Sequence, residues 1–257
     1  MCHSHKKLSV QFADAVRYLV LFSAFTAAAS CASSQASLGR QAEASANTLA
    51  WLNEHHGFVH FISLERLLGR VTAQLSGSIF RAALERKFDR GSTEYFRSFP
   101  WQVFVLEEET PNAFSLGAGV IVITRGMLER ASSEAALAAV IAHEMSHQML
   151  GHTAEALDAA APGEPVPHGH YSLEQEIAAD TLSIKMLHVA GYSLNSSAEA
   201  LTIDYRIAGT DVSPVPPRWL ELRMANIAQE IRTYPPHLPG LTSSREFAYV
   251  QQRLAGL

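Results

Sequence analysis

His143, Glu144 and His147 form an H-E-x-x-H sequence within an alanine-rich stretch that has the spacing of a helix. Side chains four residues apart lie on the same face of a helix, so both imidazoles can reach one metal ion. Two histidines with a glutamate between them are typical of zinc peptidases, in which the glutamate acts as a general base. The same pattern also occurs by chance in helices that bind no metal, so the surrounding sequence has to decide.

A zinc enzyme needs a third protein ligand and an open fourth position, and Glu176 can supply that ligand. Ser172 and Gln175 form a capping-box pattern, which predicts that a helix starts just before Glu176. Asp180 follows one turn later on the same face, where it can accept the second ring N–H of one of the histidines. The alternative is that these acids only form an acidic first turn, which the helix dipole favours. This alternative does not explain well why Asp180 lies a turn deeper, among apolar residues.

A longer zinc motif, H-E-x-x-H-x-x-G-x-x-H, is excluded because Leu150 and Thr153 occupy the positions of its glycine and third histidine. Gly151 and His152 lie nearby but out of register. We therefore interpret His152 as a residue that caps or packs near the helix end, where an imidazolium suits the helix dipole, and not as a ligand.

Three segments match a known family in its own order: N-A-F-S at 112–115 followed by T-R-G-M-L at 124–128, H-E-M-S-H at 143–147 followed by Gly151-His152, and E-I-A-A-D at 176–180 followed by A-G-Y at 190–192. They resemble the zinc metallopeptidase family that includes the bacterial heat-shock protease HtpX, the periplasmic protease BepA and the eukaryotic prenyl-protein (CAAX) endopeptidase. The resemblance implies an α+β, mostly helical gluzincin-type metallopeptidase domain with a small β-sheet beside the metal-binding helix.

The resemblance also assigns roles to single residues. It implies one Zn²⁺ per chain, bound by His143, His147 and Glu176, with Glu144 as the catalytic base. The family often has a His-Pro pair several residues before an arginine at the end of the catalytic domain, and the equivalent stretch here is residues 234–240. His237 or Tyr234 is therefore a possible oxyanion stabiliser, and the alternative is a proline-rich surface turn.

The N-terminus predicts export and a membrane anchor. The basic residues Lys6 and Lys7, a mostly apolar stretch of twelve residues at 18–29 and small residues directly before Cys31 are typical of a secretory signal. This stretch is shorter than the roughly 20 residues that a membrane helix needs. The pattern resembles a bacterial lipobox, so we expect residues 1–30 to be a lipoprotein signal peptide and Cys31 to carry lipid. Ala32 as the next residue favours the periplasmic side of the outer membrane, and a soluble periplasmic product is the alternative.

The rest of the chain predicts a tether followed by one domain. Residues 31–48 are rich in alanine, serine and glutamine, which indicates a tether, and residues 49–257 are long enough for one zinc metallopeptidase domain. The net charge of −5 without a long basic run argues against nucleic-acid binding. Strands are predicted at 101–106 and 119–124, and helices at 218–231 and 245–254. Three neighbouring histidines, His55, His56 and His60, are interpreted as exposed residues without a metal.

These observations predict a zinc endopeptidase that hydrolyses unfolded or misassembled envelope proteins, with Glu144 as general base on a zinc-bound water. We expect an extended substrate that adds a strand beside residues 119–124. The loop at 162–170 contains His168 and His170 and could plug the site, although a mobile surface loop is the alternative. A different class of function is a chaperone-like or assembly lipoprotein with a structural or plugged zinc site, acting with outer-membrane assembly machinery. Glu144 argues against it, because structural zinc needs no base.

Overall fold

The computed structural model describes residues 32–84, 96, 99–159, 171–208, 217–235 and 240–256 of the 257-residue chain. The predicted signal peptide, Cys31, the loop at 162–170 and His237 lie outside these residues. Within the described part, no helix combines the length and the apolar character needed to cross a membrane.

Helices make up most of the described chain, and three short strands form one sheet. The sheet has the order β1-β3-β2, in which β1 is parallel and β2 antiparallel to the central strand β3. This confirms the predicted α+β, mostly helical fold. The elements are α2 (Ala32–His55), α3 (Ile62–Leu84), β1 (Gln102–Leu106), β2 (Ala113–Gly117), β3 (Val120–Thr124), α5 (Arg125–Arg130), α6 (Glu134–Met149), α7 (His152–Ala159), α8 (Leu173–Ala190), α9 (Ser196–Ala208), α10 (Arg218–Ile231) and α11 (Arg245–Leu254).

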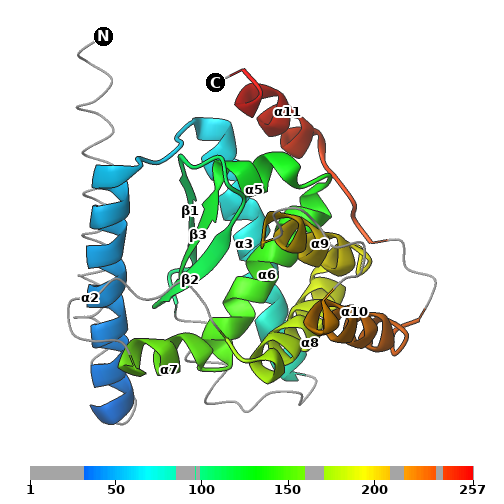
Figure 1. The fold of residues 1–257 in the computed structure, drawn as a ribbon, viewed down its shortest axis with the longest axis horizontal. Coiled ribbons are helices and arrows are strands. Elements are labelled where there is room, and N and C mark those ends of the chain that lie inside the picture. The colour runs from blue at the N-terminus through cyan, green and yellow to red at the C-terminus, as the bar shows by residue number, and fades with distance from the viewer. Residues whose placement is uncertain are drawn as a thin grey trace.

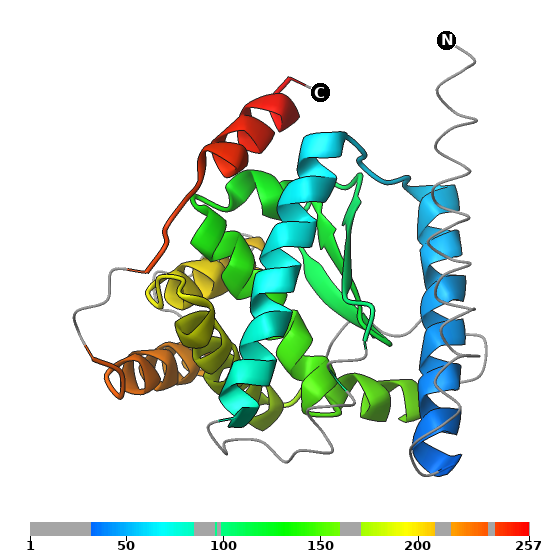
Figure 2. The ribbon, with the colours of Figure 1, turned by 180° about the vertical axis from the view of Figure 1, so that it is seen from behind.

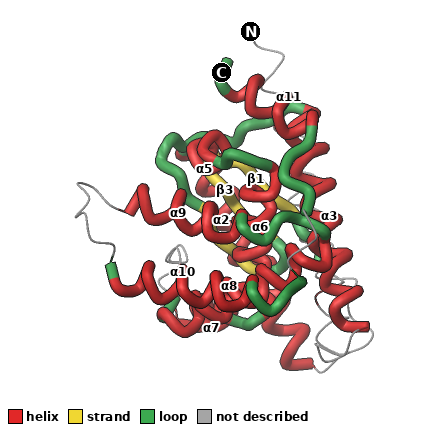
Figure 3. Tube along the Cα trace, turned by 90° about the vertical axis from the view of Figure 1, so that its right-hand side faces the viewer, coloured by secondary structure: helices red, strands yellow, loops and turns green. Residues whose placement is uncertain are grey.

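The sheet lies between two helical layers, with α2 on one side and α3 with α6 on the other (Figures 1 and 2). Side chains alternate between the two faces of each strand. Ile121 and Ile123 belong to the core shared with α3 and α6, whereas Val120 and Val122 belong to the core shared with α2. All of β3 is therefore buried, as a central strand covered on both faces requires. Figure 3 shows the strands enclosed among the helices.

Helix α2 takes the place of the tether that the sequence predicted over residues 31–48. The chain is helical from Ala32, and Leu49 is fully buried in a core cluster that includes residues of β2 and β3. Small side chains on this face of α2 allow the helix to lie close to β2. The Ser45 hydroxyl accordingly donates to the backbone carbonyl of Leu116 at 2.8 Å. The tether prediction is wrong for these residues, because alanine and serine also form a helix face that packs tightly against a sheet.

Helix α6 lies at the centre of the molecule and carries the H-E-x-x-H residues. The Ser133 hydroxyl accepts a hydrogen bond from the backbone N–H of Ala136 and so caps the first turn. The alanine-rich sequence lets α3, α8, α9 and the sheet approach the helix from several sides, and almost every α6 residue is buried. A helix that is packed all round cannot rotate or slide, so its two histidines have fixed positions.

Glu134, the first residue of α6, is buried in a polar cluster that joins α6 to α3 and α11. The Arg70 guanidinium donates to both Glu134 carboxylate oxygens, at 2.7 and 2.8 Å, and to Glu246 at 3.0 Å. Tyr192 and Ser244 also donate to Glu134. Burial raises the pKa of Glu134, but the hydrogen bonds from Arg70 and Ser244 outweigh burial and lower the pKa below its ordinary value.

We expect Glu134→Gln to lower the free energy of unfolding at neutral pH by roughly 2–3 kcal/mol, because Arg70 loses the buried one of its two carboxylate partners. The folded pKa of Glu134 is depressed, so its contribution to stability is present above the ordinary carboxyl pKa of 4.5 and is lost as pH falls through the folded value. Urea unfolding of both proteins at a series of pH values measures this, with the exposed Glu54→Gln as control. A stability difference that stays constant into strongly acidic solution would contradict the assignment.

Candidate metal centre

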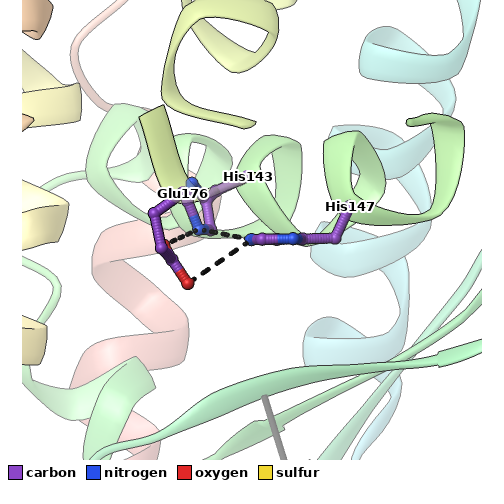
Figure 4. A group of neighbouring side chains, drawn as sticks. All are labelled: His143, His147 and Glu176. Carbon is purple, nitrogen blue, oxygen red and sulfur yellow. Dashed lines mark hydrogen bonds and ion pairs between the residues drawn. The ribbon is translucent and has the colours of Figure 1, made fainter. Parts of the chain in front are cut away.

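Helix α6 presents His143 and His147 on one face, one turn apart. Their Nε2 atoms are 3.0 Å apart, and both point toward Glu176 of α8 (Figure 4). The Glu176 carboxylate lies 3.2 Å from Nε2 of His143 and 3.9 Å from Nε2 of His147. The structure therefore brings together the three ligand atoms that the sequence predicted.

This set of donors fits a zinc ion. Ligand atoms about 2.0–2.2 Å from a shared ion can be at most about 4.4 Å apart. The shortest distance between each pair of the three side chains, 3.0, 3.2 or 3.9 Å, is below that limit. Two imidazoles and one carboxylate form a catalytic type of zinc site, which leaves a fourth position open. In the part of the chain that the structure describes, no second group of three such side chains converges. His55, His56 and His60 are exposed, as predicted.

Helix α8 begins with the capping box that the sequence predicted. The Ser172 hydroxyl accepts from the backbone N–H of Gln175, and the Gln175 side chain accepts from the backbone N–H of Ser172. This start places Glu176 in the first turn and Asp180 one turn deeper on the same face. A local motif thus aligns both acids with the histidines of α6.

Asp180 sets the orientation of His143. Its Oδ1 atom lies 3.1 Å from Nδ1 of His143, so this nitrogen donates to the carboxylate and Nε2 is left for the metal. Burial lowers the pKa of His143, but the contacts with Asp180 and Glu176 outweigh burial and raise the pKa to about 10. A metal ion that binds here has to displace a proton from His143, so metal affinity increases with pH.

Arg223 of α10 completes the site, and sequence reasoning missed it. Its guanidinium donates to both Asp180 oxygens at 2.8 Å, and a third nitrogen lies 2.8 Å from the Glu176 carboxylate. Burial raises the pKa values of both acids, but Arg223 and His143 outweigh burial and keep both values below the ordinary range. One buried cation therefore holds both carboxylates in place. The available signal was its position in the buried stripe of α10, between Leu220 and Ile227.

His147 is held by residues that follow α6 in the chain. Its Nδ1 lies 3.0 Å from Nδ1 of His152, and its ring stacks on Tyr171 with centroids 3.8 Å apart. When Nε2 of His147 faces a metal ion, Nδ1 carries the proton and donates to Nδ1 of His152. Burial lowers the pKa of His152, which suits a neutral acceptor. The predicted imidazolium at the helix end is therefore wrong, although the prediction that His152 is not a ligand agrees with this position.

We expect His152→Leu to weaken zinc binding by roughly 10- to 100-fold, because the Nδ1–H of His147 loses its acceptor and the ring is no longer held in one orientation. His152→Asn should recover part of the affinity, since its side-chain carbonyl can accept the same hydrogen bond. Competition with a chromophoric chelator measures the zinc affinity, and the exposed His55→Leu serves as control. Equal affinities for the His152→Leu protein and the parent would remove this role.

A cavity of about 160 Å³ opens beside the three ligand atoms, and Glu144 lines it. Glu144 projects from the same helix as the two histidines but is not one of the three converging ligands. Residues 112–115, at the start of β2, line another side of the cavity together with Tyr171. The cavity therefore joins a metal site, a carboxylate and the edge strand of a sheet.

The structure does not place Tyr234 at the metal. Its ring packs on His188, with centroids 4.4 Å apart, and its hydroxyl donates to Glu230 at 3.3 Å. His188 lies twelve positions after Glu176 along α8, and Tyr234 does not line the cavity. The predicted oxyanion role of Tyr234 is therefore wrong in this structure. Arg245, the arginine that follows residues 234–240 in the family comparison, is exposed at the start of α11, and the arginine at the metal centre is Arg223 instead.

Residues 78–161, which include all of α6, match the model of peptidase family M48. The match agrees with the family resemblance that the three sequence segments indicated.

The chain is also similar to proteins from mitochondria and from bacteria. The proteins named mitochondrial metalloendopeptidase OMA1 from Arabidopsis thaliana and Schizosaccharomyces pombe are 39% and 44% identical over 66 and 55 residues, which is 26% and 21% of this chain. A Vibrio cholerae protein named "Putative beta-barrel assembly-enhancing protease" is 25% identical over 177 residues, 53% of this chain. The matches span 14%, 16% and 36% of these three relatives, so this chain corresponds to only part of each.

Proposed function

We propose that this protein is a zinc-dependent endopeptidase. The observation that carries the proposal is the convergence of His143, His147 and Glu176 around one position, with Glu144 in the cavity beside them. The M48 match supports the same reaction, because three of the relatives are named as metalloendopeptidases. A purely structural zinc site needs neither an open cavity nor a neighbouring base.

Each residue of the site has a separate role in the proposed reaction. A zinc ion bound by the three ligands would supply Lewis acidity, which activates water and polarises the scissile carbonyl. Glu144 accepts a proton from the attacking water and later donates it to the leaving amine, so that one carboxylate serves as base and then as acid. Asp180 and Arg223 keep the ligands in fixed orientations, which lowers the reorganisation needed during the reaction.

An extended substrate can pair with β2, which lies at the edge of the sheet, and not with β3. The sequence predicted pairing beside residues 119–124, but these form the central strand, with β1 on one side and β2 on the other. Thr124 donates to the backbone carbonyl of Asn112, and hydrogen-bonded pairs alternate along an antiparallel ladder. The backbone groups of Ala113 and Ser115 therefore face away from β3. We infer that a substrate strand pairs with these two residues beside the cavity.

Pairing through backbone hydrogen bonds depends little on the side chains of the substrate, but it requires the substrate to be extended. We therefore propose unfolded or misassembled proteins as substrates. The signal-like N-terminus supports a location in the bacterial cell envelope, as a lipoprotein on the periplasmic side of the outer membrane. The Vibrio cholerae relative is named for beta-barrel assembly, which is compatible with envelope substrates and with a role near outer-membrane assembly machinery.

The proposed function is tested with a reduced and alkylated protein that cannot fold, incubated with the purified chain. We expect cleavage that stops when a chelator removes zinc and returns when zinc is restored. The same protein with its disulfides intact is the control, and it should be cut much more slowly. Absence of cleavage by the zinc-loaded chain, or equal cleavage of folded and unfolded protein, would contradict the endopeptidase or the substrate class, respectively.

A further inference from the structure

Beyond the ligands, residues of α5, α6, α8 and α9 also line the cavity at the metal centre. Val140 lies one turn before His143 on α6, and Ser183 lies one turn after Asp180 on α8. The remaining walls come from α5 and from the first turns of α9. We call this region the α9 pocket, and its walls are Met127, Val140, Ser183, Ser197, Ala200 and Leu201.

Ser197 is the polar group in this pocket that has no partner. It is 7% exposed, and its hydroxyl makes no hydrogen bond with any residue that the structure describes. The neighbouring Ser183 differs, because its hydroxyl donates to the backbone carbonyl of Asp180 at 2.8 Å. A buried hydroxyl without a partner is unfavourable, and such groups are commonly satisfied by water or by a ligand. Ser197 lies on a wall of the cavity that contains Glu144, so a substrate can supply that partner.

The size and the walls of the pocket limit what can enter. The whole cavity, including the space at the ligand atoms, measures about 160 Å³. A cavity of roughly 150 Å³ holds one benzene molecule, so the α9 pocket alone takes a side chain smaller than an aromatic ring. Met127, Val140 and Leu201 offer apolar contacts, and Ser197 offers one hydrogen-bonding group. A side chain with a methyl group and a hydroxyl, as in threonine, can make both the apolar contacts and the hydrogen bond.

Resting on the proposed peptidase function, we propose that the α9 pocket is the subsite for a substrate side chain next to the scissile bond. In this subsite Ser197 selects small side chains that can form a hydrogen bond. The enzyme then prefers threonine over valine, which has nearly the same shape but no hydroxyl. The preference is modest, because only one hydrogen bond separates the two side chains. Large aromatic side chains are excluded.

The test uses peptides that differ only in the residue on either side of the scissile bond, with threonine, valine, alanine or tyrosine in turn. At one of the two positions we expect kcat/KM to be roughly three- to tenfold higher for threonine than for valine, and lowest for tyrosine. In Ser197→Ala the ratio of kcat/KM for the threonine peptide to that for the valine peptide should fall to about one. Ser196→Ala changes a neighbouring serine that does not line the cavity, so it should leave the preference intact.

A binding measurement separates this inference from the proposed function. The zinc-loaded Glu144→Gln protein, with and without Ser197→Ala, is titrated with the same peptides, and the threonine peptide should bind more tightly only when Ser197 is present. If the parent cuts peptides but prefers threonine at neither position, or if Ser197→Ala leaves the preference unchanged, the inference is overturned and the peptidase function stands. If nothing is cut but threonine is bound selectively through Ser197, the subsite stands and the peptidase function fails. Equal binding of all peptides without cleavage overturns both.

Discussion

Glu144→Gln is expected to lower the rate of peptide hydrolysis by roughly 10²- to 10⁴-fold, the usual contribution of a general base. The substitution keeps the size and shape of the side chain but removes the group that accepts the proton. Zinc affinity should hardly change, because the three converging ligand atoms belong to His143, His147 and Glu176. The measurement is kcat/KM for an unfolded substrate, together with the zinc content of both proteins.

Glu174→Gln is the matched control for Glu144→Gln. Glu174 is exposed in the first turn of α8, two residues before Glu176, and does not line the cavity. Its substitution therefore makes the same chemical change away from the cavity. It should keep full activity. If Glu144→Gln retained both zinc and activity, Glu144 would not be the base. If it lost zinc together with activity, the experiment would indicate that Glu144 supports the metal site instead.

The ligands could be predicted from sequence because their arrangement depends on single helices. Four-residue spacing places His143 and His147 on one face of α6, and the capping box at Ser172 fixes the face that Glu176 and Asp180 share. Each of these relations lies within one helix. Packing of α6 against α8 then brings the two faces together, and only this last step required the structure or the family resemblance.

The errors concern contacts between elements that are distant in sequence. Arg223 follows Asp180 by 43 positions, and although its place in the stripe of α10 indicates that it faces inward, nothing local indicates that α10 packs against α8. Ser45 was assigned to a tether because alanine- and serine-rich segments are often flexible, yet it bonds to Leu116, 71 positions away. The strand beside which the substrate was expected, β3, is central because β1 pairs with it in parallel, and strand order cannot be read from the order of strands in the chain.

The second large effect is expected for Arg223→Met, which removes the guanidinium that contacts both Asp180 and Glu176. Both carboxylates then remain buried close together without the guanidinium. Breaking a buried ion pair on one side costs roughly 3–5 kcal/mol, so the metal-free protein should unfold at a clearly lower temperature. Zinc affinity should also fall by roughly 10- to 100-fold, because Glu176 and Asp180 lose the group that orients them.

Arg218→Met is the matched control, since Arg218 is the exposed first residue of the same helix. Thermal unfolding without metal and chelator competition with zinc together separate two explanations. A protein that melts normally but binds zinc poorly would show that Arg223 acts through the orientation of the ligands alone. Unchanged melting and unchanged zinc affinity would contradict the role of Arg223. Added zinc should recover part of the lost stability, because the ion replaces one positive charge beside Glu176 and binds only the folded chain.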